Sequence, residues 1–500
     1  MCVFESGKRY RAEDFPNTNW HFWKWFWAPR LFCTGIQRLT LFKSVFILGG
    51  AGVGGGSLNY CAVLLEPPDE FYSDPQWAQL QPWKKILSPF YKDARRMLGV
   101  VPNPELWKSD ELLLDYAKEI GCDASFKPTE VGIFFGEPGV EVPDPYFGGQ
   151  GPPRRGCEHT AHCMIGCKGG GKNTLDRNYL YLAEKLGAQI VPETTVVNIS
   201  PRENEGYEIT TQRSFGLRIG TKRTVTAKGV IVAAGALGTM RLLFQCKQNG
   251  SLPNLSSNLG KVVRTNSEVM VGARARNNDH NYAEGISITS SVFVDEVTHI
   301  EPVSYPAGSG AMFWLATLLT DGGTLLTRPL KHFWNCLRHP LNLIRAHSPF
   351  KWAQQVVILL VMQSLDNCLE LSWKRRWWWP FRRSFASRRT TRATPMYINA
   401  ANDAARGIAK RMNGIPQSAI TEVLGNIPLS AHILGGCVIG KDAKHGVVNE
   451  KGQVFGYDNF YITDGSIIPA NLGVNPSLTI TAMAEYVMGN IPDKNKRGGK

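Results

Sequence analysis

At residues 473–480 the chain reads Gly473-Val474-Asn475-Pro476-Ser477-Leu478-Thr479-Ile480, which has the pattern of a helix start. Asn475 can cap the helix, Pro476 suits its first position, and no helix breaker follows before Gly489. The free N–H groups and the positive dipole end of such a helix stabilise a ligand that becomes negative. The sequence therefore predicts an anion-stabilising helix terminus at Pro476.

Two further motifs precede this helix in the same region of the chain. His432 lies between apolar residues before Gly435-Gly436, and Asp464-Gly465 follows the strand-like run Phe460–Ile462. If the intervening hairpin folds back, His432 and Asn475 meet at the helix end. Removal of hydride from an alcohol requires a proton acceptor there, because the hydroxyl loses its proton as the carbon gives up hydride. The region predicts this chemistry, and a satisfied core histidine is the alternative interpretation of His432.

These motifs resemble the C-terminal end of the glucose–methanol–choline (GMC) family of flavin oxidoreductases, and most of all its bacterial cholesterol oxidase branch. The resemblance implies an α/β fold in which an FAD-binding, Rossmann-like domain is built from separated segments. It also implies an α+β substrate domain with an antiparallel sheet. The FAD-binding domain would comprise residues 1–66, 170–265 and 428–492, the substrate-binding domain residues 67–169 and 266–427, and a basic tail residues 493–500.

The N-terminal segment 1–7 reads as a short strand that ends at Glu5. In dinucleotide-binding folds an acid at the end of the second strand takes the ribose hydroxyls, about 20 residues after a glycine-rich turn. No such turn precedes Glu5 in this sequence. The resemblance therefore implies an N-terminally truncated chain without the first strand, the GxGxxG loop and the first helix, and it leaves open whether FAD still binds. An exposed acid at a frayed terminus is the alternative interpretation of Glu5.

A glycine-rich segment follows the apolar strand at residues 45–48. Gly50, Gly52 and Gly55 fit the GxGxxG pattern, but Glu66-Pro67-Pro68 would stop a following helix before it could cross over to a parallel strand. The segment is better interpreted as a loop whose missing side chains let the backbone approach a flat ring. The resemblance implies that cofactor contacts come here from Gly52, Gly54, Gly55, Ser57 and Asn59.

The remaining cofactor contacts are expected from turns that follow strands. Residues 229–237 read as a buried strand with a small-residue turn, and a helix follows through Leu243. A helix is predicted at 179–186, strands near 189–199, and an antiparallel meander around 207–209, 216–219 and 224–226. The resemblance implies that the ribityl or pyrophosphate part lies at Asp464-Gly465 and the flavin pyrimidine edge at the helix start. Its full set of cofactor contacts here is Val197, Ala234, Gly235, Asp464, Gly465, Asn475, Pro476 and Ser477.

One acid in the second half of the chain is a candidate for substrate chemistry. Glu301 precedes Pro306-Ala307-Gly308 at the spacing that steroid oxidases of the family show for an acid facing the substrate. The resemblance implies that Glu301 can shuttle a proton during isomerisation of the oxidised steroid. An exposed acid at a strand end is the alternative interpretation.

The composition is that of a globular protein with a strongly basic balance. The net charge of +14 suits an anionic partner such as a membrane surface, or belongs to a merely basic enzyme. The odd number of cysteines, 11, favours free thiols and a reducing compartment. No signal peptide is visible, and the apolar runs fall short of the roughly 20 residues of a spanning helix. A cytoplasmic or peripheral membrane protein is therefore expected.

Three segments combine aromatic and basic residues, at 20–27, 310–350 and 373–383. The segment at 373–383 is the strongest candidate for membrane contact, whereas buried packing explains 20–27 equally well. Arg and Trp also grip nucleic acids, but none is expected, because an apolar substrate fits a membrane better. The cysteines and histidines at 157–167 have spacing that could hold zinc or an iron–sulfur cluster, yet no metal is expected.

The resemblance implies FAD-dependent oxidation of a bulky apolar alcohol, foremost a 3-hydroxysteroid such as cholesterol. His432 and Asn475 would bind the hydroxyl, hydride would pass to the flavin, and oxygen or another acceptor would take the electrons. Isomerisation of the ketone through Glu301 is an optional second step. The alternatives are a dehydrogenase for another apolar alcohol with an acceptor other than oxygen, and an inactive, truncated lipid-binding homologue.

Overall fold

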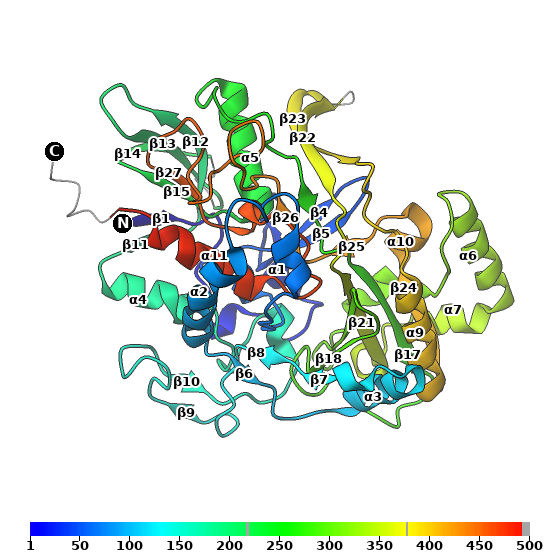
Figure 1. The fold of residues 1–500 in the computed structure, drawn as a ribbon. Helices are drawn as coiled ribbons and strands as arrows, with labels where there is room; N and C mark the ends of the chain where they lie inside the picture. The colour runs from blue at the N-terminus through cyan, green and yellow to red at the C-terminus, as the bar shows by residue number, and fades with distance from the viewer. Residues whose placement is uncertain (217–219, 377–378, 493–500) are drawn as a thin grey trace.

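The computed structural model describes residues 1–216, 220–376 and 379–492, so the predicted basic tail lies outside the described residues. The chain forms an α/β part from widely separated segments and a second part around a large antiparallel sheet (Figure 1). This arrangement confirms the predicted fold class. The residue limits of the two predicted domains stay a prediction.

The α/β part joins strands from both ends of the chain. β1 (Cys2–Phe4) pairs in parallel with β11 (Gln189–Val191), and β15 (Val230–Val232) pairs in parallel with β27 (Phe460–Ile462). Helices α5 (Gly235–Asn249) and α11 (Ser477–Gly489) follow β15 and β27 in the sequence. An antiparallel meander is present as β12 (Thr194–Pro201), β13 (Tyr207–Arg213) and β14 (Lys222–Ala227). The last two strands contain the pieces predicted at 207–209 and 224–226, β12 contains a strand predicted separately, and most of the piece predicted at 216–219 lies outside the described residues.

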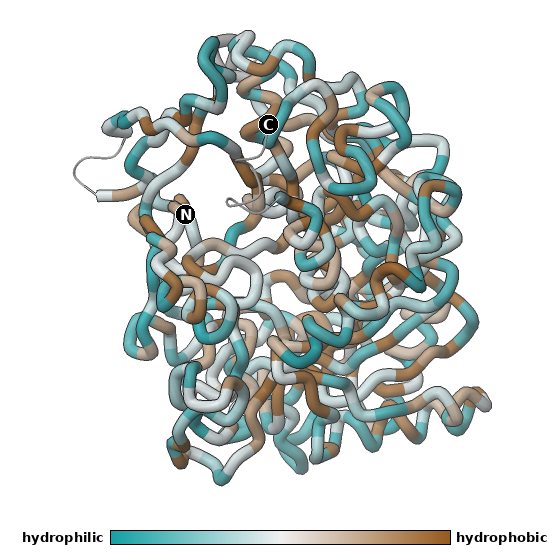
Figure 2. Tube along the Cα trace, turned by 60° about the vertical axis from the view of Figure 1, so that its left-hand side comes forward, coloured by the Kyte–Doolittle hydropathy of each residue, from teal (hydrophilic) through white to brown (hydrophobic). Residues whose placement is uncertain are grey.

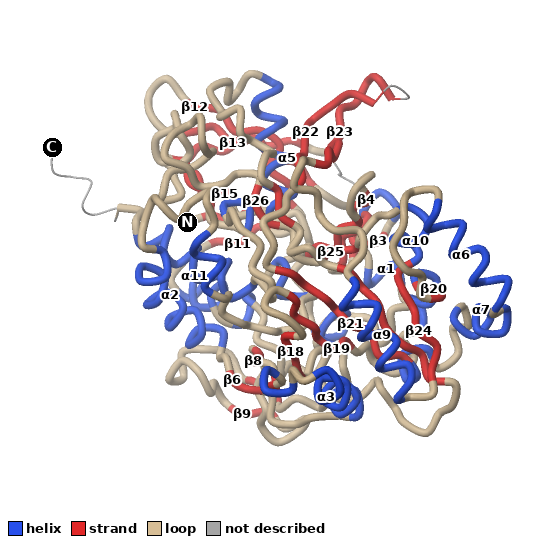
Figure 3. The backbone as a smooth tube through the Cα atoms, turned by 45° about the vertical axis from the view of Figure 1, so that its right-hand side comes forward, coloured by secondary structure: helices blue, strands red, loops and turns tan. Residues whose placement is uncertain are grey.

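The second part is built on a seven-stranded antiparallel sheet. Its strand order is β20 (Ala316–Leu318), β24 (Gly414–Ala419), β17 (Val269–Ala275), β21 (Val356–Gln363), β19 (Thr298–Val303), β18 (Ser290–Phe293) and β7 (Lys127–Pro128). Helices α3 (Lys108–Ile120) and α9 (Asn399–Arg411) cover one face (Figure 3). Since side chains alternate along a strand, the other face is left for the α/β part and for a cavity.

Further elements complete the two parts. They are α1 (Phe22–Trp25), α2 (Trp83–Leu98), α4 (Tyr179–Lys185), α6 (Thr327–Arg338), α7 (Pro340–Ala346), α8 (Trp352–Gln355), α10 (Ile420–Gly425), β4 (Gln37–Leu41), β5 (Phe46–Gly50), β16 (Val263–Arg264), β22 (Leu369–Arg376), β23 (Trp379–Arg389), β25 (Leu429–Ser430) and β26 (Leu434–Gly435). Helices α2 and α11 pack together, and β5 is flanked by β4 and by β25. This packing brings the glycine-rich strand β5 next to the segment that leads to His432.

The aromatic-basic segments have different environments. Trp25 and Trp27 are buried, whereas Trp20 and Trp23 are exposed, so the segment 20–27 combines packing with an open surface. The segment 373–383 lies in the β22–β23 hairpin, of which residues 377–378 lie outside the described residues. Along the trace, hydrophobic stretches are short and interrupted (Figure 2), and no helix of the described residues has the length and apolar character to cross a membrane.

Candidate active site

A cavity of about 270 Å³ lies where the antiparallel sheet meets the α/β part. Residues of β17 and β21 form an apolar wall, which includes Met270, Gly272, Ile358 and Leu360. The facing wall contains the glycines of β5 and the start of α11, with the polar side chains of Asn59, His432 and Asn475. The cavity is therefore apolar over most of its wall and polar at one side.

His432 reaches the cavity and is held there by a buried carboxylate. Its Nδ1 contacts Oε1 of Glu268, and Oε2 of Glu268 accepts a hydrogen bond of 2.7 Å from the backbone N–H of Ala431. Burial lowers the pKa of His432, but the carboxylates of Glu268 and Glu301 outweigh it, so that this pKa is raised from its usual 6.5. Because Glu268 occupies Nδ1, the second ring nitrogen, Nε2, is left for a ligand.

Asn475 and Glu301 form a second buried polar pair beside His432. Nδ2 of Asn475 donates a hydrogen bond of 3.1 Å to Oε2 of Glu301. Within the described part of the chain, Oδ1 of Asn475 and Oε1 of Glu301 have no hydrogen-bond partner. Burial raises the pKa of Glu301 to about 7, against the opposing effects of the Asn475 amide and the His432 charge. A carboxyl group with this pKa can both accept and return a proton near neutral pH.

A third ionisable side chain, His299, lies two residues before Glu301 on the same side of β19. Its Nδ1 is 4.0 Å from Oε1 of Glu301, and its ring stacks on Phe293 with 4.4 Å between the ring centroids. Burial and the positive charge of Lys127 lower the pKa of His299 to about 3, so the ring is neutral. The sheet thus supplies Glu301 with a neutral, polarisable neighbour rather than a counter-charge.

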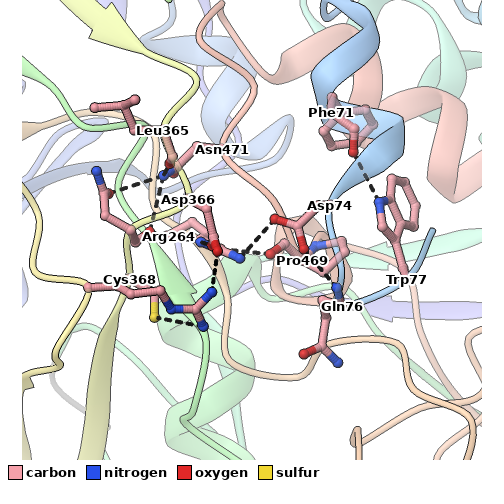
Figure 4. A network of polar contacts seen from close by, with 12 residues as sticks. Phe71, Asp74, Gln76, Trp77, Arg264, Leu365, Asp366, Cys368, Pro469 and Asn471 are labelled. Carbon is pink, nitrogen blue, oxygen red and sulfur yellow. Dashed lines mark hydrogen bonds and ion pairs between the residues drawn. The ribbon is translucent and has the colours of Figure 1, made fainter. Parts of the chain in front are cut away.

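A buried network fixes the loop that leads to Asn475 (Figure 4). Arg264 forms ion pairs of 3.0 Å with Asp74 and 2.6 Å with Asp366, and its Nε donates a hydrogen bond of 2.7 Å to the carbonyl of Pro469. Asn471 donates a hydrogen bond of 2.7 Å to the carbonyl of Leu365. These contacts tie the loop between β27 and α11 to the edge of the sheet part.

A single asparagine, Asn266, completes this support. Its Oδ1 accepts hydrogen bonds of 3.0 and 2.8 Å from the backbone N–H groups of Leu472 and Gly473, and its Nδ2 donates one of 2.9 Å to the carbonyl of Val474. The next side chain, Asn475, is thereby turned toward Glu301. The prediction that Asn475 caps the helix was wrong, because α11 begins at Ser477 after Pro476 as its N-cap residue.

The glycine-rich segment contributes a bare backbone surface to the cavity. A Cβ atom added at Gly49, Gly55 or Gly56 would meet no atom of the described structure within 4 Å. Asn59 braces the strand, since its Nδ2 donates hydrogen bonds of 2.9 Å to Oε1 of Gln37 and 3.1 Å to the carbonyl of Gly49. The segment therefore forms a loop that lets a flat group approach, and no long helix follows it.

Other predicted cofactor residues lie in and around this loop. Gly52 and Gly54 have φ angles of +128° and +113°, which favour glycine. The hydroxyl of Ser57 serves the loop itself, because it donates a hydrogen bond of 2.7 Å to the carbonyl of Gly54 and accepts one from the backbone of Leu175. Oε1 of Glu5 accepts hydrogen bonds of 2.6 Å from Gly7 and 3.1 Å from Gly52, so this acid is part of an ordered turn.

The turns after β15 and β27 come together because the two strands pair in parallel. Thr239 of α5 donates a hydrogen bond to Oδ2 of Asp464 and accepts one of 3.2 Å from the backbone N–H of Ala234. Gly235 has a φ of +70° and open space in front of it, and Gly465 directly follows Asp464. Val197 does not belong to these turns. It lies in β12, where the register of the pairing with β13 shifts.

Comparisons of the sequence with known proteins identify the family of the chain. Two profiles of GMC oxidoreductases match the chain, at residues 153–261 and 373–484. A cholesterol oxidase of Acinetobacter baumannii is 42% identical over 504 residues, which cover 99% of this chain and 90% of that protein. The chain belongs to the GMC oxidoreductase family. A cholesterol oxidase of Mycobacterium tuberculosis is 44% identical over 510 residues, which cover 99% of this chain and 87% of that protein.

Solved structures share the fold of this GMC oxidoreductase at much lower sequence identity. Pyridoxine 4-oxidase from Mesorbium loti has a TM-score of 0.56 at 11% identity, and the match covers 97% of this chain and 93% of that chain. An FAD-dependent oxidoreductase from Chaetomium thermophilum has a TM-score of 0.55 at 16% identity, with 98% and 94% covered. These likenesses concern the fold alone.

FAD is the cofactor of GMC oxidoreductases, and the residues around the cavity fit it. The bare backbone at Gly49 and Gly56, which line the cavity, leaves room for a flat ring. The N-terminus of α11, without a side-chain cap, faces the same cavity through Pro476 and Ser477. The unpartnered Oδ1 of Asn475 adds a buried acceptor among the described residues. Which of the predicted residues contact FAD stays a prediction.

Four residues of this site escaped the sequence interpretation. They are Glu268, His299, Asn266 and Gln37. Glu268 had a usable signal, because it is an acid directly before the apolar run Val269–Ala273. A charged group in such a position is buried only with a partner, and that partner is His432. His299, Asn266 and Gln37 had no comparable signal, since their roles depend on neighbours that lie far away in the sequence.

Proposed function

We propose that this protein is an FAD-dependent oxidase of 3-hydroxysteroids, with cholesterol as the representative substrate. The observation that carries the proposal is that His432 and Asn475 line a largely apolar cavity, and each is bonded to a buried acid behind it, Glu268 and Glu301 respectively. Both curated relatives named above are cholesterol oxidases, and their identity of 42% and 44% extends over nearly the whole chain. A steroid has the matching shape, a rigid apolar body with one hydroxyl at its end.

Different residues of the chain bind the substrate hydroxyl, accept its proton and stabilise the charge that develops. Bound FAD supplies the hydride acceptor. His432 accepts the hydroxyl proton at Nε2, while Glu268 holds Nδ1 and stabilises the imidazolium that forms. Asn475 directs its amide at the hydroxyl oxygen and keeps Glu301 in place through Nδ2. The N-terminus of α11 stabilises negative charge that develops in front of Pro476.

Glu301 supports a second step on the ketone product. Its carboxylate takes a proton from the carbon between the ketone and the ring double bond and returns it at the far end of the shifted double bond. A pKa of about 7 suits both transfers at neutral pH. The step thus moves a double bond into conjugation with no change in oxidation state.

The test compares alcohols and electron acceptors with the purified, yellow holoprotein. We expect turnover of detergent-dispersed cholesterol with formation of hydrogen peroxide, and loss of turnover in Asn475→Leu with flavin retained. Turnover of another apolar alcohol with an artificial acceptor, and no peroxide, would support the dehydrogenase alternative. A colourless protein without turnover would overturn the proposal and support an inactive lipid-binding homologue.

Sterols reside in lipid bilayers, so the enzyme must meet its substrate there. We therefore include peripheral membrane contact in the proposed function. The positive net charge of +14 supports attraction to an anionic surface.

A further inference from the structure

Helices α6 and α7 carry an apolar stripe that faces away from the protein. Seven large side chains of this stripe are more than half exposed: Leu326, Leu330, Phe333, Trp334, Leu337, Leu341 and Ile344. Within α6 the spacing of three and four residues places Leu330, Phe333, Trp334 and Leu337 on one face, and Leu341 and Ile344 are three residues apart on α7. We call this set the outer stripe. Singly exposed apolar residues need no explanation, but a contiguous set of this size marks a contact surface.

The inner face of α6 is polar and firmly bonded, which fixes the orientation of the helix. Arg328, 1% exposed, donates hydrogen bonds to the carbonyls of Met396, at 2.7 Å, and Glu422, at 3.0 Å. The buried ring of His332 hydrogen-bonds with the hydroxyls of Thr317 and Thr320. Nδ2 of Asn335 donates a hydrogen bond of 3.0 Å to the carbonyl of Leu319. The helix is thus inverted relative to an ordinary surface helix, whose apolar side faces the core.

The charges around the outer stripe favour one kind of partner. Residues 322–365 contain no Asp or Glu, whereas Lys331, Arg338 and Arg345 are exposed on the same two helices. A second copy docked through this face would bring like charges together. An anionic lipid surface accepts both features, because its headgroups attract the cations and its acyl region receives the apolar side chains.

The helical pair is also connected to the cavity. The chain leaves the cavity wall at Leu315 and Ala316, forms α6 and α7, and returns to the wall at Trp352 and Val356. Both helices pack against β20 and stand at the outer edge of the molecule (Figures 1 and 3). Trp314, which precedes the segment that forms α6 and α7, is itself 45% exposed. The segment that carries the outer stripe therefore begins and ends at residues of the cavity wall.

We infer that α6 and α7 form an in-plane anchor whose outer stripe enters the interface of an anionic membrane. Lys331, Arg338 and Arg345 remain at the level of the headgroups. The inference rests on the proposed function only for the identity of what passes from the lipid into the cavity. The docking itself depends on the helices alone.

The test uses the flavin-loaded protein of 500 residues and vesicles that contain no sterol. Cosedimentation is measured with phosphatidylcholine vesicles that contain phosphatidylglycerol and with phosphatidylcholine alone. We expect binding to the anionic vesicles that weakens with salt, and at least tenfold weaker partitioning for the variant Leu330→Ser/Phe333→Ser/Trp334→Ser/Leu337→Ser. The matched control, Leu106→Ser/Ile120→Ser/Leu186→Ser/Val225→Ser, removes exposed apolar side chains elsewhere and should bind like the parent.

Three outcomes would overturn the inference. They are a parent protein that does not bind anionic vesicles, a stripe variant that binds as well as the parent, and a parent dimer that the stripe variant separates. Because the substituted side chains are exposed, thermal unfolding of both variants should match the parent, which separates docking from misfolding. Turnover of detergent-dispersed cholesterol tests the proposed function separately. Its absence in a parent that still binds vesicles would refute the oxidase and leave the anchor standing.

Discussion

The substitution Glu268→Gln tests the proton acceptor most directly. In the parent, both oxygens of Glu268 are used, one by His432 and one by the backbone N–H of Ala431 at 2.7 Å. A glutamine side chain offers only one oxygen. The backbone N–H of Ala431 can only donate and therefore needs this oxygen, whereas Nδ1 of His432 can either donate or accept. The NH2 group of the glutamine then faces Nδ1 of His432. The imidazole must accept there, so its proton moves to Nε2, and the atom that should take the substrate proton becomes a donor.

The expected loss follows from this change of tautomer. A positioned general base contributes roughly a hundred- to ten-thousandfold to a rate. Removal of the base function should therefore slow flavin reduction by about 10²- to 10⁴-fold, which corresponds to about 3–5 kcal/mol. The pKa of His432 should also fall in the variant, because the carboxylate that opposes the effect of burial is gone.

The assay is anaerobic stopped-flow reduction of the bound flavin by cholesterol in detergent, over a range of pH. In the parent, the rate should fall as the pH drops through the raised pKa of His432, because the imidazolium cannot accept a proton. Glu422→Gln is a suitable control, since Glu422 is an equally buried acid that pairs with Arg328 and does not line the cavity. Reduction of Glu268→Gln within threefold of the parent rate, with flavin bound, would refute the assigned role.

Three other substitutions give separate tests. Since the pKa of Glu301 is raised from 4.5 to about 7, the parent should lose up to roughly 3 kcal/mol of unfolding free energy as the pH rises from 4.5 to beyond 7. Glu301→Gln should lack this loss in denaturant titrations, and equal pH profiles would contradict the burial argument. Arg264→Met leaves the Asp74 carboxylate buried without its counter-charge and should cost about 3–5 kcal/mol in chemical unfolding. Adding Asp74→Asn should recover part of that cost, and no recovery would show that the ion pair is not responsible. Gly49→Val projects a side chain into open space on a strand, so it should keep the thermal midpoint and lower the flavin content, measured by absorbance. Full flavin content in Gly49→Val would show that the ring lies elsewhere.

Local patterns were sufficient for several elements from which cofactor contacts are predicted. The strand–turn–helix pattern predicted β15 and α5, and the glycine-rich segment was correctly interpreted as a loop after a strand. These features depend on neighbouring residues, so the sequence shows them. The prediction for the start of α11 missed by one residue, so Asn475 does not cap the helix. Its Nδ2 donates instead to Glu301, 174 residues away in the chain, and no local pattern indicates that bond.

The orientation of α6 shows a second limit of sequence interpretation. Helical periodicity tells which residues share a face, but the usual rule would bury Leu330, Phe333 and Trp334. The structure buries Arg328 and His332 instead. Arg328 donates hydrogen bonds to the carbonyls of Met396, before α9, and Thr320, after β20, and His332 hydrogen-bonds with the hydroxyl of Thr317 in β20. Those acceptors come from remote segments. Only the tertiary structure therefore reveals that the apolar side of the helix faces outward.

Different parts of the cavity select the substrate and position its reactive group. An apolar wall discriminates weakly, because one methylene group more or less changes binding by only about 1–3 kcal/mol. The polar groups, in contrast, gather at one side, where His432, Asn475 and Glu301 are each backed by another buried group. A ligand without a terminal oxygen would leave those buried groups unpaired, and such a loss is far more costly than a poor apolar fit. The site should consequently accept a range of rigid apolar bodies that end in a hydroxyl or a ketone, and reject any that lack a terminal oxygen.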